Sequence, residues 1–403
     1  PEAYIQLLSK SFPDEVEGIR SFIDNMIGVA DDADKLSKNK GKFEKMMFPF
    51  QYKYMWNVRN KTLKEFLDDH VKNPELQHAL AGLWGYYGLP PSKLSAFYYA
   101  ISTGEYLKHG SYYIKERSQN LSDSLASAIE KGGGMILYGT EAKKILINNG
   151  AVQGIEVSGG KTIPARIVVS NANAPDTFMR MLPVGSLPDD YVDKIKQYRA
   201  SLSSFIVWLG LNKDVKDMIK NYSTHVSIDD PEMEYQACLM GDIERSGFTV
   251  TIYDNLFKGY SRPGCSTVSV MSLCGYEHWR RFESDYKKGL KESYLKEKQR
   301  WTKILIRKAE DYVIPGLSSM IDVVESATPL TNWFFTRNHE GAIYGYDESI
   351  DNSFMSRIDN RTPVKGLYLA SAWGNPGGGY SGVLRSGYNT YSHIIEDLAD
   401  FLK

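Results

Sequence analysis

The segment GLYLASAWGNPGGGYSGVLRSG, which runs from Gly366 to Gly387, is the most informative part of this 403-residue chain. Its pattern predicts a short apolar strand over Leu367–Ala370, then a glycine-rich turn, then a helix over Val383–Leu402. A strand that breaks into such a turn and opens a helix leaves backbone N–H groups exposed at the helix N-terminus. Groups of this kind bind electron-rich oxygen atoms of a ligand.

The number of glycines favours ligand contact over a purely structural turn. Five glycines and one proline lie between Gly374 and Gly382, both included. A glycine has no Cβ, so its backbone can approach a ligand closely or adopt a positive φ angle. A tight turn would account for two glycines, whereas five indicate a binding site.

Composition describes an ordinary globular protein with two closely packed domains. Hydrophobic residues make up 42% of the chain and charged residues 24%, and 403 residues are too many for one ordinary core. The formal net charge is −1, so nothing points to nucleic acid as a partner. Aromatic residues reach 12%, which suits a core, an apolar ligand tunnel or a surface that touches a membrane.

The cysteines and histidines predict no metal site. Cys238, Cys265 and Cys274 are too few and too widely spaced for a disulfide framework or a zinc site. This usage favours a reducing compartment, which we take to be the cytoplasm. The seven histidines show no metal-ligand spacing, and no apolar run approaches the roughly 18 residues that span a bilayer.

Four segments differ in pattern along the chain. Residues 1–110 are predicted to be helical, and residues 183–325 combine helices with an antiparallel sheet. Residues 111–182 and 326–403 complement each other, so we expect them to form one domain around which the other segments are arranged. A ligand would then bind in the cleft between the two domains.

Residues 111–182 have the pattern of a nucleotide-binding module. A helix is predicted around Leu121–Ile129 and a strand at Met135–Tyr138. The sequence Asn-Asn-Gly at 148–150 separates two apolar runs, which is a strong hairpin signal. A further strand over Thr162–Val169 leads into small polar residues around Asn171. We interpret this as the second part of a Rossmann-like domain that binds FAD or NAD(P).

The segment 183–325 is predicted to carry an antiparallel sheet with one covered face. The expected strands are Ser204–Leu211, Tyr235–Met240, Phe248–Tyr253, Ser266–Leu273 and Ile321–Ala327, and a long charged helix is expected over Tyr286–Ala309.

Three other places are candidates for a pocket wall. Thr328 can cap a helix that opens at Pro329, which would aim a second helix N-terminus at the cleft. The loop 338–346 has an apolar tip, for which a surface position is the alternative. For Tyr86 and Tyr87, the two aromatic residues of the turn 85–88, core packing and a pocket wall are equal alternatives. No Ser-His-Asp or Cys-His set has a recognisable spacing, so no catalytic residue is assigned, and any hard chemistry would belong to a cofactor.

The quoted segment resembles the C-terminal flavin-contacting signature of the FAD-dependent phytoene desaturase, carotenoid isomerase and retinol saturase family. Segments 84–91, 168–172, 328–331 and 341–345 are similar to the retinol-saturase-like branch of that family. The resemblance covers most of the chain. It implies an FAD-dependent oxidoreductase that acts on C=C or CH–CH bonds of a polyene or isoprenoid lipid of carotenoid or retinoid type, as a desaturase or saturase.

The same resemblance implies partners and site residues. The electron partner would be NAD(P) or a quinone, and the protein would lie on a membrane surface and take up an apolar small molecule. The implied cofactor-binding residues are Ala142, Asn171, Gly374, Asn375, Pro376, Gly377, Gly378, Gly379, Gly382 and Val383. The candidate substrate-pocket residues are Trp84, Tyr86, Tyr87, Thr328, Tyr344 and Tyr380.

The chain departs from the family pattern at one important place. The family's first strand, its Gly-x-Gly-x-x-Gly turn and its ribose-binding acidic residue have no counterpart near Pro1. Segment 377–382 has that spacing, but no βαβ unit follows it. We therefore expect an α/β fold in which the Rossmann-like domain lacks its N-terminal part and is interleaved with a mixed α+β substrate domain of helices and an antiparallel sheet.

Other functions stay open at this level. One alternative is a flavin-dependent carotenoid cis–trans isomerase. Another is a module that binds an apolar lipid without catalysis, because the phosphate-binding segment is absent. A flavin amine oxidase is a further, weaker interpretation that the C-terminal motif permits.

Overall fold

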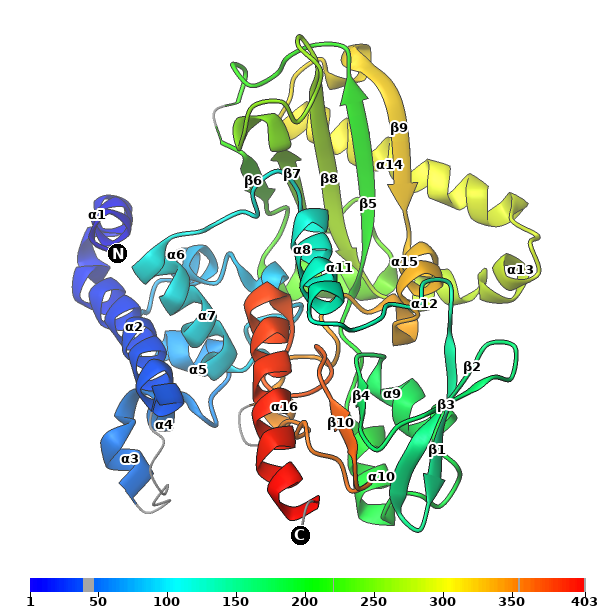
Figure 1. Cartoon of the computed structure of the whole chain (residues 1–403). Coiled ribbons are helices and arrows are strands. Elements are labelled where there is room, and N and C mark those ends of the chain that lie inside the picture. The colour runs from blue at the N-terminus through cyan, green and yellow to red at the C-terminus, as the bar shows by residue number, and fades with distance from the viewer. Residues whose placement is uncertain (39–46, 220, 354–355, 402–403) are drawn as a thin grey trace.

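The computed structural model describes residues 1–38, 47–219, 221–353 and 356–401 (Figure 1). The chain builds a helical region, a large antiparallel sheet with its helices, and a smaller strand-and-helix module. Each of these three regions has its own cluster of buried apolar residues. The combination of helices and sheets in this fold is as predicted. The domain boundaries at residues 110, 182 and 325 stay predictions.

The first region is helical because its apolar residues recur at helical spacing and its helices are capped. Thr62 forms a capping box with Glu65, and Asn73 caps the helix that starts at Pro74. Phe22 is fully buried in the core of this region. The helices are α1 (Glu2–Ser11), α2 (Val16–Lys38), α3 (Phe48–Gln51), α4 (Lys53–Val58), α5 (Leu63–Asp68), α6 (Pro74–Leu80) and α7 (Ala96–His109).

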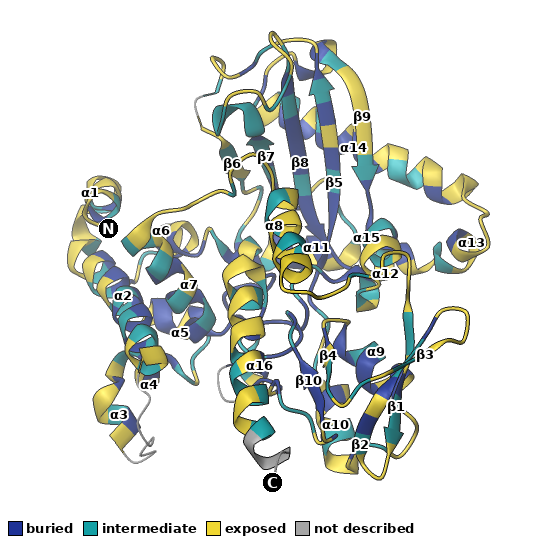
Figure 2. Ribbon diagram, viewed as in Figure 1, coloured by how far each residue is buried: buried dark blue, intermediate teal, exposed yellow. Residues whose placement is uncertain are grey.

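The second region is a five-stranded antiparallel sheet in the order β6-β7-β8-β5-β9. Its strands are β5 (Ser203–Leu211), β6 (Ser223–Val226), β7 (Phe248–Ile252), β8 (Ser266–Cys274) and β9 (Ile321–Ala327). Phe205 and Val207 of β5 point to the covered face, where helix α14 (Glu292–Tyr312) places Trp301 against Phe205 at a ring distance of 5.3 Å. The opposite face, which carries Trp208, is partly exposed (Figure 2). We call it the open face of the sheet.

The prediction of a strand at Tyr235–Met240 is wrong, because these residues form helix α11 (Pro231–Met240). The Asp230 side chain accepts hydrogen bonds from the first backbone N–H groups of the helix. Pro231 stands at its first position, and Gly241 ends it in the left-handed conformation. These start and stop signals outweigh the apolar run that suggested a strand.

Two other differences concern the same region. Strand β6 has no counterpart in the sequence prediction. The long helix predicted over Tyr286–Ala309 consists of α13 (Glu283–Lys287) and α14, because Gly289 takes a positive φ of 79° between them. The remaining helices here are α12 (Glu277–Arg280) and α15 (Pro329–Thr336).

The third region contains strands from the second and the last segment of the chain. Strands β1 (Ala142–Asn148) and β2 (Ala151–Val157) form the predicted hairpin, and β3 (Thr162–Pro164) extends it. Strand β4 (Val168–Ser170) pairs in parallel with β10 (Leu367–Leu369). The single strand predicted over Thr162–Val169 is therefore two strands in two different sheets, and Pro164, which lacks an N–H group, ends the first.

The helices of the third region are α8 (Ser118–Lys131), α9 (Ala174–Asp176), α10 (Asp189–Gln197) and α16 (Gly379–Phe401). Short 3-10 turns lie at Pro13–Glu15, Trp84–Tyr86, Tyr253–Asn255, Leu317–Met320, His339–Gly341 and Ile350–Asn352, and a π turn lies at Thr177–Met181. Helix α16 starts at Gly379, four residues before the predicted start at Val383.

The strand predicted at Met135–Tyr138 is not formed. No strand of the described chain lies beside these residues, and Met135 and Tyr138 are exposed. A strand requires a neighbour for its backbone hydrogen bonds, which explains the difference. Helix α8 likewise has no buried residue, although Leu125 and Ile129 repeat at helical spacing.

Much of helix α16 is exposed (Figure 2), and both α16 and strand β4 carry apolar residues that are uncovered. Leu384 and Tyr388 lie one helical turn apart on α16 with exposures of 47% and 69%. Val169 is 45% exposed, and its backbone faces the edge of β4 that has no pairing strand in the described chain. Parallel sheets are normally buried, so this exposure is unusual. We call Leu125, Ile129, Met135, Val169, Leu384 and Tyr388 the uncovered apolar group.

Candidate functional site

The glycine-rich turn lies where the two parallel strands of the third region end. The Val168 N–H donates to the Gly366 carbonyl at 2.8 Å, and the Ala370 N–H donates to the Ser170 carbonyl at 3.0 Å. The Asn171 side-chain amide donates to the Ala370 carbonyl. The structure therefore places Asn171 next to the start of the turn. Asn171 and the turn would have to be neighbours in this way if both contacted one cofactor.

The inner side of the turn rests on buried polar side chains. The Arg357 guanidinium, which is fully buried, donates to the carbonyls of Ala372 and Gly374, each at 2.7 Å. The Asn360 side-chain oxygen accepts a hydrogen bond from the Asn375 N–H at 3.0 Å. These contacts hold residues 372–375 from one side and fix the path of the turn.

Glu348 completes this support. Its carboxylate forms a 2.9 Å ion pair with Arg357 and accepts a hydrogen bond from the Gly378 N–H. A Cβ on Gly377 would lie 3.0 Å from a Glu348 carboxylate oxygen, so the ion pair lies directly against the turn. Burial raises the pKa of Glu348 to about 7, although the positive charge of Arg357 opposes this shift.

The outer side of the turn is open. Gly379, Tyr380 and Ser381 are exposed, and their N–H groups have no acceptor within α16, because they precede its first intrahelical hydrogen bonds. Gly379 has a φ of 77°, and nothing lies within 4 Å of the position that a Cβ would take. Space for a ligand and free N–H donors therefore coincide here. This arrangement fits the electron-rich edge of a flavin ring.

Tyr344 links the turn to the open face of the sheet. Its backbone carbonyl lies 2.9 Å from the position of a Cβ on Gly378, and its hydroxyl donates to the Gly85 carbonyl at 2.7 Å. The neighbouring Tyr86 lies 3.1 Å from Nε2 of His225 on β6, hydroxyl oxygen to ring nitrogen. Two predicted pocket residues, Tyr344 and Tyr86, thus lie between the turn and the sheet.

Tyr380 approaches the same face from the start of α16. It lies near enough to Tyr113 to help raise the pKa of that phenol, after burial as the main cause. The Tyr113 ring in turn contacts Tyr253 at the end of β7, with ring centroids 6.4 Å apart. Tyr86 and Tyr344 therefore border the open face, whereas contact of Tyr380 with this face stays a prediction.

The other three predicted pocket residues have partners inside the protein. Trp84 is buried and packs edge-on against Tyr235. The Tyr87 hydroxyl bonds with Thr103 at 2.9 Å, and burial raises its pKa to about 12. Thr328 is completely buried and caps α15 through the N–H groups of Leu330 and Thr331. Their side chains contribute to the fold, and a role in substrate contact stays a prediction.

The remaining cofactor candidates occupy different places. Ala142 lies at the start of β1, at the margin of the third core rather than in the turn, so its contact with an adenine stays a prediction. Gly382 allows a tight fold, since its Cβ would lie 2.6 Å from the Gly377 carbonyl. Pro376 accepts a hydrogen bond from the Tyr98 hydroxyl, and Val383 is half-buried in the first turns of α16.

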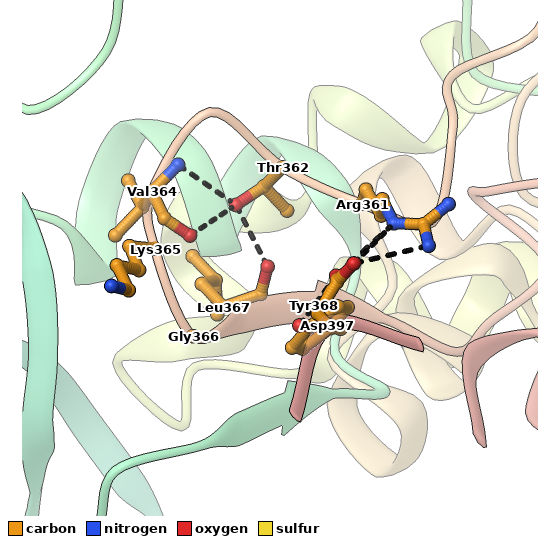
Figure 3. Close-up of a pocket in the computed structure, with 8 residues that line it drawn as sticks. All are labelled: Arg361, Thr362, Val364, Lys365, Gly366, Leu367, Tyr368 and Asp397. Carbon is orange, nitrogen blue, oxygen red and sulfur yellow. Dashed lines mark hydrogen bonds and ion pairs between the residues drawn. The ribbon is translucent and has the colours of Figure 1, made fainter. Parts of the chain in front are cut away.

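A pocket of about 220 Å³ lies at the other end of β10 (Figure 3). It is lined by Arg361, Thr362, Val364, Lys365, Gly366, Leu367, Tyr368 and Asp397. Arg361 forms ion pairs with Asp397 and Glu396, so its charge is already balanced. The pocket lies at the start of β10, and the glycine turn follows the end of this strand, so the two do not form one site.

Three supporting residues have no counterpart in the sequence prediction: Glu348, Arg357 and Asn360. Each lies 15 to 30 positions before the part of the turn that it contacts, in a loop without helix or strand periodicity. A charged pair in such a loop is normally solvated. Only the tertiary fold shows that Glu348 and Arg357 are buried beneath the turn.

The described residues contain neither a metal-binding cluster nor a membrane-spanning helix. No group of histidine, cysteine or acidic side chains among them could hold a metal ion. None of their helices combines the length and the apolar character needed to cross a membrane.

Curated relatives match most of this chain at low identity. An all-trans-retinol 13,14-reductase from Danio rerio is 24% identical over 77% of this chain and 54% of its own length. A phytoene desaturase (neurosporene-forming) from Rhodobacter capsulatus is 27% identical over 79% of this chain and 60% of its own. A chloroplastic prolycopene isomerase from Daucus carota is 24% identical over 69% and 43%. The chain thus spans about half the length of the curated relatives it matches.

Solved structures show the same fold. Putrescine oxidase bound to putrescine aligns over 93% of this chain and 76% of its own, with a TM-score of 0.59 and 14% identity. An oxidoreductase from Methanosarcina mazei aligns over 87% and 75%, with a TM-score of 0.56 and 16% identity.

The sequence profile of one protein family covers nearly all of the chain. The profile described as flavin containing amine oxidoreductase matches residues 6–395. The relatives are those of the predicted resemblance, which is thereby confirmed. The chain belongs to the flavin containing amine oxidoreductase family, within which it is similar to retinol 13,14-reductases, prolycopene isomerases and phytoene desaturases.

Proposed function

We propose that this protein is an FAD-dependent oxidoreductase that acts on C=C or CH–CH bonds of a polyene or isoprenoid lipid of carotenoid or retinoid type. The observation that carries the proposal is the glycine turn at the joined ends of β4 and β10, packed on its inner side and open on its outer side. Family membership and the three named relatives support the flavin and the polyene, respectively.

The residues of the turn would hold the ring end of FAD. The N–H groups of Gly379, Tyr380 and Ser381 would bind its electron-rich oxygens, and Gly377 and Gly378 would keep the backbone close. When bound, FAD supplies the transfer of a hydride to or from carbon, and NAD(P) or a quinone would be the electron partner. The chain itself orients the substrate and excludes water.

The open face of the sheet would form the substrate wall. Ile206 and Met271 are paired across β5 and β8, and Trp208 lies beside them on the same face. Tyr86 and Tyr344 border this face with aromatic surface and hydroxyl groups, and Tyr380 would border it too. An apolar and aromatic wall of this kind suits a long conjugated hydrocarbon.

The test is a flavin-bleaching experiment on the full-length protein. We expect the purified protein to be yellow, with flavin absorbance that bleaches when a retinoid or carotenoid donor is added without oxygen. A colourless protein that takes up no FAD would overturn the flavin assignment. A yellow protein that none of a panel of carotenoids and retinoids bleaches or reoxidises would overturn the polyene assignment.

Two alternative functions give different results in this experiment. A carotenoid cis–trans isomerase, which the Daucus carota relative favours, would change the substrate's absorption spectrum while the net redox state of the flavin stays constant. An apolar-lipid-binding module would bind a polyene without any flavin signal.

We also propose that a dinucleotide-binding segment completes the module in the full-length protein. The uncovered apolar group and the unpaired edge of β4 are what such a segment would cover. The greater length of the curated relatives is consistent with it. Covered in this way, Met135–Tyr138 would gain the neighbour that a strand requires.

Contact with a membrane surface is a further part of the proposal, with a cytoplasmic location. Several exposed tyrosines, including Tyr86, Tyr112 and Tyr380, lie on segments that border or lead to the open face. Tyrosine suits an interface because one end of it is apolar and the other polar. Binding to liposomes in a flotation assay tests this, and loss of flotation after Tyr112→Ser would support it.

A further inference from the structure

Beneath the glycine turn lies a buried charged pair, Arg357 and Glu348. The pair is on the inner side of the turn, so it does not itself face the open side where a ligand would bind. The Arg357 side chain has no exposed surface, and the Glu348 side chain is 7% exposed. Their 2.9 Å contact is therefore an ion pair in the protein interior. A buried ion pair costs desolvation energy, and apolar residues of similar size often replace one without loss of stability. Its position directly against the turn therefore calls for a functional explanation.

The geometry makes Glu348 sensitive to charge above the turn. Its carboxylate accepts the Gly378 N–H hydrogen bond, and its oxygen lies 3.0 Å from the Cβ position of Gly377. Arg357 holds the carbonyls of Ala372 and Gly374. Any change of charge on this pair acts on the turn through one peptide layer and through a medium that contains little water.

Few other ionisable groups face Glu348 from the elements packed around it. Asp347 comes from the same loop, and Tyr98 and Tyr87 come from α7 and the turn before it. Tyr98 is a phenol that burial keeps protonated, since its pKa is raised. Burial also raises the pKa of Asp347, whose carboxylate is hydrogen-bonded to Ser349 at 2.7 Å rather than to the turn.

We propose that Glu348 is a positioning residue that couples proton uptake to reduction of the cofactor at the turn. With Glu348 ionised, the pair with Arg357 is neutral. With Glu348 protonated, the positive charge of Arg357 is unbalanced beneath the turn, which stabilises an electron-rich ring above it. The proposal rests on the proposed function, because it needs a flavin at the outer side of the turn.

Burial places the switch in a useful pH range. The pKa of Glu348 is raised to about 7, so both charge states of the pair are accessible near neutral pH. A carboxyl group with its ordinary pKa of 4.5 would stay ionised there and could not act in this way.

The experiment measures the flavin midpoint potential of the full-length, flavin-loaded protein against pH. For the wild type we expect a change of slope near pH 7. Glu348→Gln keeps the shape and a hydrogen-bond acceptor but cannot ionise, so its plot should lack the change of slope. Above pH 7 its potential should be more positive, by about tenfold in the ratio of reduced to oxidised flavin, or ~30 mV for a two-electron couple.

Two further variants keep the test decisive. Asp347→Asn removes the neighbouring buried carboxyl group and should keep the change of slope. Tyr98→Phe removes a hydroxyl group that lowers the pKa of Glu348, so it should move the change of slope to higher pH. If Glu348→Gln does not fold, the movement of the change of slope in Tyr98→Phe serves as the test. Difference infrared spectroscopy of the protein without flavin provides an independent readout. The wild type should show a carboxylic acid signal that titrates near pH 7, and Glu348→Gln should lack it.

The outcomes separate this inference from the proposed function. A protein that binds no flavin overturns the proposed function and this inference with it. A protein that binds flavin, but in which the wild type and Glu348→Gln give superimposable plots of potential against pH, overturns only the role of Glu348. If Tyr98→Phe leaves the change of slope at the same pH as in the wild type, the role of Glu348 is likewise overturned while the proposed function stands.

Discussion

The two sheets of this protein differ in how completely the chain covers them. The five-stranded sheet has long pairings, and α14 buries one of its faces against Trp301. The β4–β10 sheet has two strands of three residues each, and Val169 on its free edge is exposed. The first is stabilised by contacts within the chain. The second leads into a turn that rests on the buried pair Arg357–Glu348, so the function and the stability of this turn depend on the same few residues.

The largest expected effect concerns the covered face of the large sheet. Trp301→Ala leaves a cavity against Phe205 and Trp279, and should lower the free energy of unfolding by about 3–5 kcal/mol. Trp208→Ala, on the open face, is the matched control and should cost about 1 kcal/mol. Urea unfolding followed by circular dichroism measures both. Equal losses would contradict the distinction between the two faces.

Substitution of Arg357 tests the support of the turn that follows the small sheet. Arg357→Met leaves Glu348 buried without its partner and removes two hydrogen bonds to the turn, which should cost about 3–5 kcal/mol. Adding Glu348→Gln should recover part of this loss, because an unpaired carboxyl group is no longer buried. A double variant as unstable as the sum of the single variants would show that the two residues act independently.

Stability should depend on pH through Glu348. Its pKa is raised from 4.5 to about 7 in the folded protein, so between these values the folded state retains a proton that the unfolded chain has lost. Its contribution is complete below pH 4.5 and is lost as pH rises to about 7, at up to about 1.4 kcal/mol per pH unit. Unfolding curves across this range should show the decline in the wild type, and the difference from Glu348→Gln should be constant above it. A wild-type stability that rose with pH across this range would show that the pKa of Glu348 is lowered by folding, not raised.

The uncovered apolar group provides the next test. In the full-length protein Leu384→Gln should lower the free energy of unfolding by about 2 kcal/mol, because the proposed dinucleotide-binding segment covers α16. Were this face of α16 open to water, the same substitution would change stability by no more than about 0.5 kcal/mol. Thermal or chemical unfolding of the two proteins distinguishes these values.

The smallest expected effects on stability separate two glycines of α16. Gly379→Ala forces a side chain into a positive φ of 77° and should cost about 1 kcal/mol, yet it should weaken FAD binding clearly, because a methyl group enters the open side of the turn. Gly387→Ala lies within the same helix with free space around it, and should stabilise the protein by about 0.5–1 kcal/mol without affecting FAD. Equilibrium titration of the apoprotein with FAD gives the comparison.

Local patterns predicted much of the fold. The capping residues Thr62 and Thr328, the hairpin at 148–150 and four strands of the large sheet are found as expected, because each depends on neighbours in sequence. The strand predicted at Tyr235–Met240 is wrong because the helix-capping signals at Asp230 and Gly241 outweigh the apolar run between them. The strand predicted at Met135–Tyr138 failed for a different reason, since a strand also needs a partner that local pattern does not supply.

The amino-acid sequence alone determined that a glycine turn lies between a strand and a helix, and that its backbone can approach a flavin. It did so because a missing Cβ and a helix start are local properties. Only the tertiary structure decided which side of the turn is open, and that Glu348 and Arg357 lie beneath the other side. Burial and the pKa that follows from it arise from contacts between residues distant in sequence, here α7, the loop around Glu348 and the turn. For that reason the charge beneath the turn is absent from every local pattern of the chain.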